Sequence, residues 1–301
     1  LPKTRNITMN AEPAQATMIG TLEVVPIDGP VGAEIKGVNL ANVDDVTYRR
    51  IRQALIDNLV LLFRDQEISD AEMVAFSRLF GELDMAPPQE NGLQAVDGLP
   101  EIMVISNVKE NGVPIGSLGD GEAIWHTDMN YQEYPPLGSA LYAREVPPVG
   151  GDTGFCNMYK ALERLPAGLR KRIESLSIKH DASKTSGGYL RKGFEEVSDV
   201  SQTVGAVHPI IRKHPESGRE VLYLGRRLNA YIMGMSVEDS EALLDEIWSY
   251  TTREEHTWHH QWRVGDVVFW DNRTVMHRRD AFDAGSRRIM HRTQIADRPS
   301  P

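Results

Sequence analysis

The chain has 301 residues, of which 41% are hydrophobic and 25% charged, as in an ordinary globular protein rather than a disordered or fibrous one. Its 43 acidic residues outnumber its 33 basic ones, and the formal net charge of −10 argues against a general nucleic-acid surface. The longest apolar run, residues 59–63, is far too short to span a membrane.

The N-terminal region predicts a tail and no targeting signal. Residues 1–20 are mixed polar and small and lack the apolar stretch of a signal peptide, so we expect a flexible tail there. Residues 21–301 are expected to form a single domain. The lone cysteine, Cys156, excludes an intrachain disulfide and suits a reducing compartment, which favours a cytoplasmic protein. We also expect a homo-oligomer that does not attach to a membrane.

The first third of the chain predicts two strands, a helix and a buried strand, at residues 22–27, 32–38, 45–58 and 59–63. Ser69 followed by Glu72 is a capping box, which predicts that a second helix begins at residue 70. Gly81 is well placed to end that helix.

Later elements predict the fold class. Pro166 and Ser236 are placed to begin two further helices. Short strands are predicted at residues 206–211, 221–224, 267–270 and 289–295. Because the helices gather towards the N-terminal half and the flanks, we expect a mainly β fold with flanking helices. Its core would be a β-sandwich or jelly-roll rather than alternating βαβ units.

Three polar, glycine-rich segments are predicted to be loops. They cover residues 87–100, 109–121 and 183–200. Loops of this length are uncommon in compact domains unless they cover or line a binding site. We therefore expect these segments to complete a pocket.

Three short stretches carry the residue types of a metal site. They are Trp-His-Thr-Asp at 125–128, Trp-Asp-Asn-Arg at 270–273 running on to His277, and Arg-Arg-Ile-Met-His-Arg at 287–292. Two histidines and one carboxylate bind non-haem Fe(II) on one face and leave the other positions open. His126 and Asp128 are two residues apart, so in an extended segment both side chains point to the same face. Either histidine alone is more often structural.

Two arginines could hold anions near such a metal. Arg288 and Arg292 are four residues apart, so on a strand they would share a face at a separation of about 13 Å. A guanidinium matches a carboxylate in two parallel hydrogen bonds. Thr153, after two glycines and an aspartate, could add a hydroxyl to the same anion. The alternative is that the arginines form a solvated edge and that Thr153 is a turn residue.

A second cluster could bind zinc instead. Residues 254–260 hold three histidines near two glutamates, which would suit a zinc-dependent hydrolase. In an extended segment His256 and His260 share one face while His259 lies on the other, and this alternation suits a sheet surface better. Cys156 has no base near it in sequence and is read as buried packing. A non-catalytic small-molecule sensor is a further alternative.

Taken in order, these motifs resemble the taurine dioxygenase and 2,4-dichlorophenoxyacetate dioxygenase family of Fe(II)/2-oxoglutarate-dependent oxygenases. The likeness runs from about residue 22 to residue 296. Besides the three stretches above, it rests on Gly-Gly-Asp-Thr at 150–153 and on Gly-Asp at 265–266. The resemblance implies a double-stranded β-helix, the jelly-roll form, with helices packed outside.

The resemblance also implies roles for single residues. His126, Asp128 and His277 would bind Fe(II), and Thr153 and Arg288 would hold the distal carboxylate of 2-oxoglutarate. Arg292 would lie near the acidic group of the prime substrate or contact the keto acid. The implied reaction consumes O2 and 2-oxoglutarate, releases succinate and CO2, and hydroxylates the prime substrate.

The prime substrate is expected to be a small organic anion. Where taurine-specific members carry a histidine and then a tyrosine, this chain has Ala86 and Gln89, so taurine itself is disfavoured. Together with Met129 and the retained Arg292, these positions favour an aryloxyalkanoate or related carboxylate. The alternatives within the family are an alkylsulfonate or sulfate ester and a modified amino acid.

Overall fold

The computed structural model describes residues 22–87, 94–121 and 123–298. The predicted tail at residues 1–20 and the candidate Gln89 lie outside these ranges. Among the described residues, no helix has the length and apolar character needed to cross a membrane.

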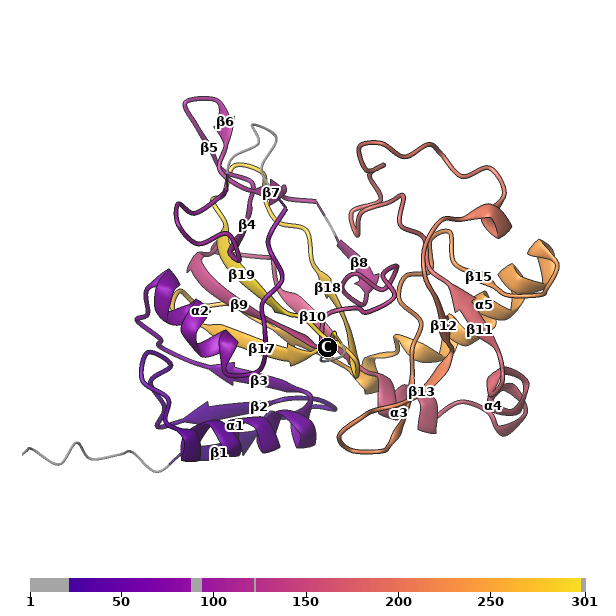
Figure 1. The fold of residues 1–301 in the computed structure, drawn as a ribbon, viewed down its shortest axis with the longest axis horizontal. Helices are drawn as coiled ribbons and strands as arrows, with labels where there is room; N and C mark the ends of the chain where they lie inside the picture. The colour runs from indigo at the N-terminus through magenta and orange to yellow at the C-terminus, as the bar shows by residue number, and fades with distance from the viewer. Residues whose placement is uncertain (1–21, 88–93, 122, 299–301) are drawn as a thin grey trace, which may run out of the picture.

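An eight-stranded sheet forms one layer of the core. Its order is β1 (Glu23–Pro26), β2 (Ala33–Lys36), β3 (Val60–Phe63), β17 (Val267–Asp271), β9 (Gly138–Glu145), β19 (Ile289–Ile295), β4 (Met103–Ser106) and β7 (Ser117–Leu118). The pairs β2–β3 and β4–β7 are parallel, and the other pairs are antiparallel. Figure 1 shows this sheet through the middle of the molecule.

A four-stranded antiparallel sheet forms the second layer. Its order is β16 (Thr257–His260), β10 (Thr153–Asn157), β18 (Val275–Arg279) and β8 (Ala123–His126). Within it, His277 lies opposite Phe155 on one side and opposite His126 on the other. The pairing thus places two of the candidate metal ligands on neighbouring strands.

Smaller elements surround the two sheets. The helices are α1 (Asp45–Asn58), α2 (Asp70–Arg78), α3 (Met158–Glu163), α4 (Ala167–Ile173) and α5 (Val237–Thr251), with 3₁₀ turns η1 (Val200–Gln202) and η2 (Glu254–His256). The minor sheets are β12 (Val207–Pro209), β11 (Ser177–Lys179) and β15 (Tyr231–Ile232); β13 (Ile211–Lys213) and β14 (Glu220–Leu222); and β5 (Lys109–Glu110) and β6 (Val113–Pro114).

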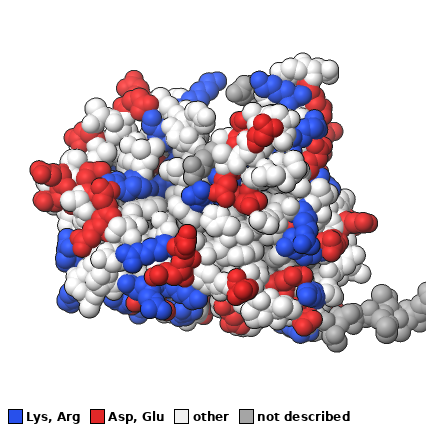
Figure 2. Space-filling view, turned by 180° about the vertical axis from the view of Figure 1, so that it is seen from behind, with Lys and Arg blue, Asp and Glu red and all other residues white. Residues whose placement is uncertain are grey.

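Strand β17 shows how the layers are built. All five of its residues are buried, because both faces of the strand are covered. Val267 and Phe269 pack in a cluster with residues of α1 and α2, the indigo and violet helices of Figure 1. Val268 and Trp270 face the other way and pack in a cluster with residues of β10 and β18. Figure 2 shows the reverse face of the molecule, where acidic and basic side chains are interspersed.

Several predicted elements are confirmed. Helix α1 and strand β19 have the predicted bounds, and Ser69 and Glu72 form the capping box of α2 through both of its hydrogen bonds. Helix α2 ends at Arg78, and residues 79 and 80 form a turn that leads to Gly81.

Other elements differ from expectation. The segment predicted as one strand at 206–211 is divided between β12 and β13, which belong to different sheets. The predicted loop at 109–121 contains β5, β6 and β7. Strand β9 lies in the middle of the large sheet and was not predicted, because its sequence of small, apolar and charged residues carries no clear alternation.

Candidate metal centre and co-substrate pocket

A cavity of about 360 Å³ lies where the two sheets meet. The candidate residues that line it are His126, Asp128, Met129, Thr153, His277, Arg288 and Arg292. Ala86 is half-buried, and the residues of its segment that line the cavity are its neighbours Met85 and Pro87. Residues from the two predicted loops at 109–121 and 183–200 also contribute, among them Leu118 and Arg191.

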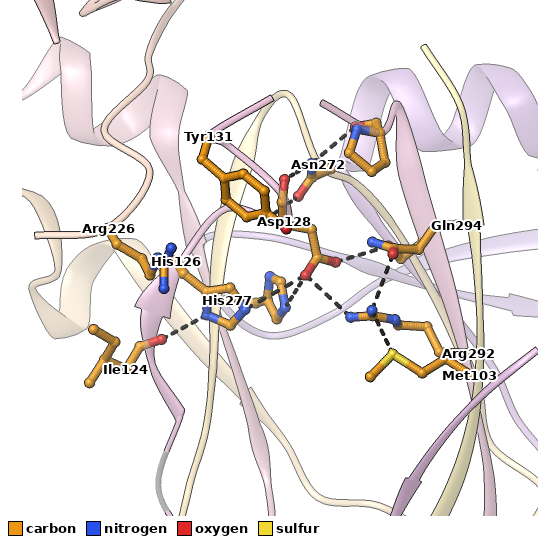
Figure 3. A network of polar contacts seen from close by, with 12 residues as sticks. Met103, Ile124, His126, Asp128, Tyr131, Arg226, Asn272, His277, Arg292 and Gln294 are labelled. Carbon is orange, nitrogen blue, oxygen red and sulfur yellow. Dashed lines mark hydrogen bonds and ion pairs between the residues drawn. The ribbon is translucent and has the colours of Figure 1, made fainter. Parts of the chain in front are cut away.

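Three potential metal ligands meet at one side of this cavity. One ligand atom from each of His126, Asp128 and His277 lies within 4.8 Å of the other two, and among the residues that the structure describes this is the group of three that could hold a metal ion. Oδ1 of Asp128 lies 3.7 Å from Nε2 of His126 and 3.8 Å from Nε2 of His277. Figure 3 shows the carboxylate directed at both rings.

The backbone that carries these ligands differs from the sequence-based expectation in two ways. Strand β8 ends at His126, so Asp128 lies in the following turn rather than on a continuous strand. Met129, next in that turn, has a φ of 47°, in the left-handed region that non-glycine residues rarely adopt. His277 lies within β18, where no strand was predicted, so its position is fixed by pairing on both sides.

Asn272 explains how the turn is held. Its Oδ1 accepts a hydrogen bond from the backbone N–H of Asp128 at 2.8 Å. Its Nδ2 donates to the carbonyls of Asp128 and Pro136, each at 3.0 Å. Ser139 Oγ donates to Oδ2 of the Asp128 carboxylate at 3.0 Å, which leaves Oδ1 facing the histidines. Asn272 of the Trp-Asp-Asn-Arg motif therefore holds the backbone of the turn, and Ser139 orients the carboxylate.

The protonation states suit metal binding. Nδ1 of His126 lies 2.7 Å from the carbonyl of Ile124, a contact satisfied when Nδ1 carries the proton and Nε2 is free to coordinate. Burial, with the neighbouring His126, lowers the pKa of His277 to about 3, so its ring is neutral near pH 7. Burial alone would raise the pKa of Asp128, but Arg292 and the two histidines hold it below its usual range. The donor set is two imidazoles and one carboxylate.

Arg288 forms a second feature of the cavity. It is 2% exposed, and its Nε and Nη2 have no hydrogen-bond partner among the described residues. Burial, together with the nearby charge of Arg279, lowers its pKa to about 9. Gly151 leaves room for it, since a Cβ there would lie 3.2 Å from the Arg288 Cδ and Nε. A buried guanidinium without acceptors is costly, so this end of the cavity is built for an anion.

Thr153 and Arg292 complete the predicted set. Thr153 Oγ1 accepts a hydrogen bond from Trp262 Nε1 at 2.9 Å, which leaves the hydroxyl proton available to a ligand. Arg292 donates to Asp128 Oδ1 at 3.3 Å and to Gln294 Oε1 at 3.1 Å, as Figure 3 shows. Arg288 lies one residue before the first residue of β19, whereas Arg292 lies within the strand. Both arginines still line the cavity.

The alternative zinc cluster does not converge. His256 Nδ1 contacts the carbonyl of Thr251 at 2.9 Å, His260 Nε2 contacts Asp266 at 3.0 Å, and His259 Nδ1 contacts Asp280 at 3.1 Å. The three rings therefore serve three separate structural contacts. Cys156 is fully buried, and burial raises the pKa of its thiol to about 12, as expected for packing rather than reactivity.

Sequence reasoning missed four arginines that line the cavity, Arg191, Arg226, Arg278 and Arg279. Arg226 is 4% exposed and donates to the carbonyl of Asp181 at 2.8 Å, and Arg191 donates to the hydroxyl of Tyr131. Neither position carried a motif. Arg279 follows His277 by two residues on β18. The strand rule of alternate residues on one face could have found it.

Two imidazoles and a carboxylate beside a buried arginine without hydrogen-bond acceptors, in a core of two β-sheets, are typical of mononuclear metal oxygenases that use an acidic co-substrate. The sequence model of the taurine catabolism dioxygenase TauD, TfdA family matches residues 23–294, and the chain belongs to this family. The predicted jelly-roll core is confirmed by its structural neighbours. Like the family, the chain is an enzyme, a dioxygenase dependent on Fe(II), 2-oxoglutarate and O2.

Relatives whose names give different substrates are about equally similar to this chain. The chain is 32% identical to an (S)-phenoxypropionate/alpha-ketoglutarate-dioxygenase of Sphingobium herbicidovorans, over 94% of this chain and 98% of that protein. It is 33% identical to an alpha-ketoglutarate-dependent sulfate ester dioxygenase of Pseudomonas putida, over 89% and 87%. A crystal structure of AAD-2 in complex with Mn(II) and N-oxalylglycine is 28% identical and superposes with a TM-score of 0.75, over 93% and 98%.

Asn272 offers a test of how the site is built. Asn272→Ala would leave the buried N–H of Asp128 and two carbonyls without their partners. We expect the free energy of unfolding, measured by urea titration, to fall by about 2 kcal/mol or more. Asn58→Ala, which removes one half-buried bond to the Ala54 carbonyl, should cost less than about 1 kcal/mol. Equal losses in the two variants would contradict this account.

Proposed function

We propose that His126, Asp128 and His277 hold the Fe(II) of this enzyme, and that Thr153 and Arg288 bind the distal carboxylate of 2-oxoglutarate. One observation carries the proposal. The ligand group and the unpartnered guanidinium of Arg288 line one cavity, so a keto acid held at the metal by one end can be neutralised at the other. The donor chemistry and the orphaned cation both fit the groups that the family uses.

With Fe(II) and 2-oxoglutarate bound at these residues, O2 would be the oxidant, and the keto acid would supply two of the electrons and leave as succinate and CO2. The residues of the chain bind, orient and exclude water. Trp270 packs its ring 4.8 Å from that of His277 and Phe155 stacks behind, which fixes the imidazole. Arg292 stays beside the Asp128 carboxylate, where its charge keeps that ligand ionised. The buried walls keep the reacting carbon away from bulk water.

For the prime substrate we propose an aryloxyalkanoate or related carboxylate. Apolar side chains of Met85, Met103, Ile105, Leu118 and Met129 line the cavity and would bury an aromatic or alkyl group. Arg292, whose Nε has no partner among the described residues, would meet the acid group. The phenoxypropionate relative supports this class, and the sulfate-ester relative supports the alternative.

Other expectations stay predictions. These are the single domain at residues 21–301, the homo-oligomer and the cytoplasmic location. Roles for Ala86 and Gln89 in substrate binding stay predictions as well, although Ala86 lies between two residues that line the cavity.

The metal assignment predicts that His277→Ala loses bound iron and turnover, because a three-ligand site has no spare ligand. Iron per chain would be measured on anaerobically purified protein, and turnover as succinate release. His259→Ala is the control, since it removes a partly exposed histidine that contacts Asp280. Near-normal iron and activity in His277→Ala would contradict the assignment.

The two arginines should separate co-substrate from substrate. Arg288→Lys loses the planar fork, so we expect the apparent KM for 2-oxoglutarate to rise about tenfold or more, which corresponds to about 1.4 kcal/mol. Arg292→Lys should mainly raise the apparent KM for the organic acid. Arg287→Lys, exposed and paired with Glu145, should change neither. The reverse pattern would exchange the two roles.

The substrate class predicts a ranking. Burying an aryl group against the methionine-rich wall contributes about 25 cal/mol per Å², whereas taurine would bring a second charge with no matching partner. We expect substrate-coupled succinate release with aryloxyalkanoic acids to exceed that with taurine by at least about tenfold. A panel in which taurine or an alkyl sulfate ester matched every aryloxy acid would overturn this choice in favour of the sulfur-containing class.

A further inference from the structure

We infer that Arg279 is a second arginine of the 2-oxoglutarate site, which binds the distal carboxylate together with Arg288 and Thr153. This inference rests on the proposed function. It makes recognition of the keto acid in this chain the work of two guanidinium groups instead of one.

The strand register places Arg279 at the anion end of the cavity. On β18, His277 and Arg279 are two residues apart and point to the same face, about 6.8 Å from one another along the strand. His277 lies opposite Phe155 on β10, and Arg279 lies opposite Thr153. Side chains of directly opposite residues stand about 5 Å apart at Cβ. Arg279 is therefore the cross-strand neighbour of the threonine hydroxyl that is proposed to bind the co-substrate.

Arg279 is also close to Arg288. The guanidinium carbons of the two lie 5.7 and 6.0 Å from the centre of the same ring, Phe282. The charge of Arg279 is among the causes that lower the pKa of Arg288. Both arginines line the cavity, so they present two like charges to one space.

Among the described residues, these charges are offset only by carboxylates beyond ion-pair distance, Asp120 for Arg279 and Asp152 for Arg288. Arg279 is 9% exposed, and its Nη2 donates to the carbonyls of Leu118, at 2.9 Å, and Gly121, while its Nε has no partner in the described part of the chain. No ion pair joins either arginine to a carboxylate among the described residues. Two buried like charges cost free energy unless an anion compensates them. A ligand carboxylate between them would remove that cost.

The keto acid is the better candidate for this anion than the prime substrate. A five-carbon dicarboxylate held at the metal by its keto-acid end spans about two residues of a strand, the separation between His277 and Arg279. Arg292, proposed for the prime substrate, lies on the other sheet, at β19. Arg279 should therefore strengthen the binding of keto acids that have a distal carboxylate. It should not affect the binding of a monocarboxylic keto acid, which lacks that group.

Discrimination between keto acids tests this. Anaerobic calorimetric titrations of the Mn(II)-loaded enzyme would use 2-oxoglutarate and 2-oxobutyrate, which lacks the distal carboxylate. Arg279→Gln keeps a donor for the Leu118 carbonyl. We expect it to raise the Kd for 2-oxoglutarate at least about tenfold and to leave the Kd for 2-oxobutyrate unchanged. Arg279→Lys should recover part of the loss, because it restores the charge. Arg287→Gln removes an equal charge on the surface next to Arg288 and should change neither ligand.

Each result decides a point. Suppose that Arg279→Gln weakens the binding of both keto acids equally, or of neither, while Arg288→Lys weakens the binding of 2-oxoglutarate. The inference about Arg279 is then wrong, and the proposed function stands. If wild-type enzyme binds 2-oxoglutarate no better than 2-oxobutyrate, the proposed co-substrate site itself is wrong. Thermal unfolding of every variant identifies a loss of fold, and in that event the lysine variant alone decides, since recovery of selectivity requires the charge.

Discussion

The hydrogen bonds between Asn272 and the backbone of Asp128 are the constraint on which the site depends. They join positions 144 residues apart and hold the turn that carries the Asp128 carboxylate beside His126 and His277. Asn272 can do this because it follows β17, a strand buried on both faces at the centre of the large sheet. The rigid core thereby fixes the position of the Asp128 carboxylate.

The electrostatics of the cavity run against those of the whole chain. The net charge of −10 would repel a dianionic co-substrate, yet the cavity is lined by arginines. Burial makes these charges effective, because a guanidinium in a site of low dielectric is little screened by salt. It also makes them costly without a ligand. The same arrangement therefore favours the binding of an anion in this cavity.

Sequence patterns predicted the elements whose bounds depend on residues close together in the chain. The bounds of α1, the capping box of α2 and the extent of β19 follow from caps and periodicity. The candidate ligands could be named because their residue types are rare in this order. What the sequence could not give is set by long-range pairing: the central position of β9, the split of 206–211 between two sheets, and the turn at Asp128.

Arg279 illustrates the limit most clearly. In sequence it is one of a pair of arginines after a histidine, and no motif marks it as a site residue. Its importance depends on the register that sets it opposite Thr153, and register between β18 and β10 is fixed only when the whole sheet forms. His277 pairs with His126, and Arg279, two residues further along β18, pairs with Thr153, so the sheet sets the spacing between the two pairs. We propose that a co-substrate whose two ends match that spacing fits this pocket, and that the loops lining the cavity, through residues such as Leu118 and Arg191, select the prime substrate.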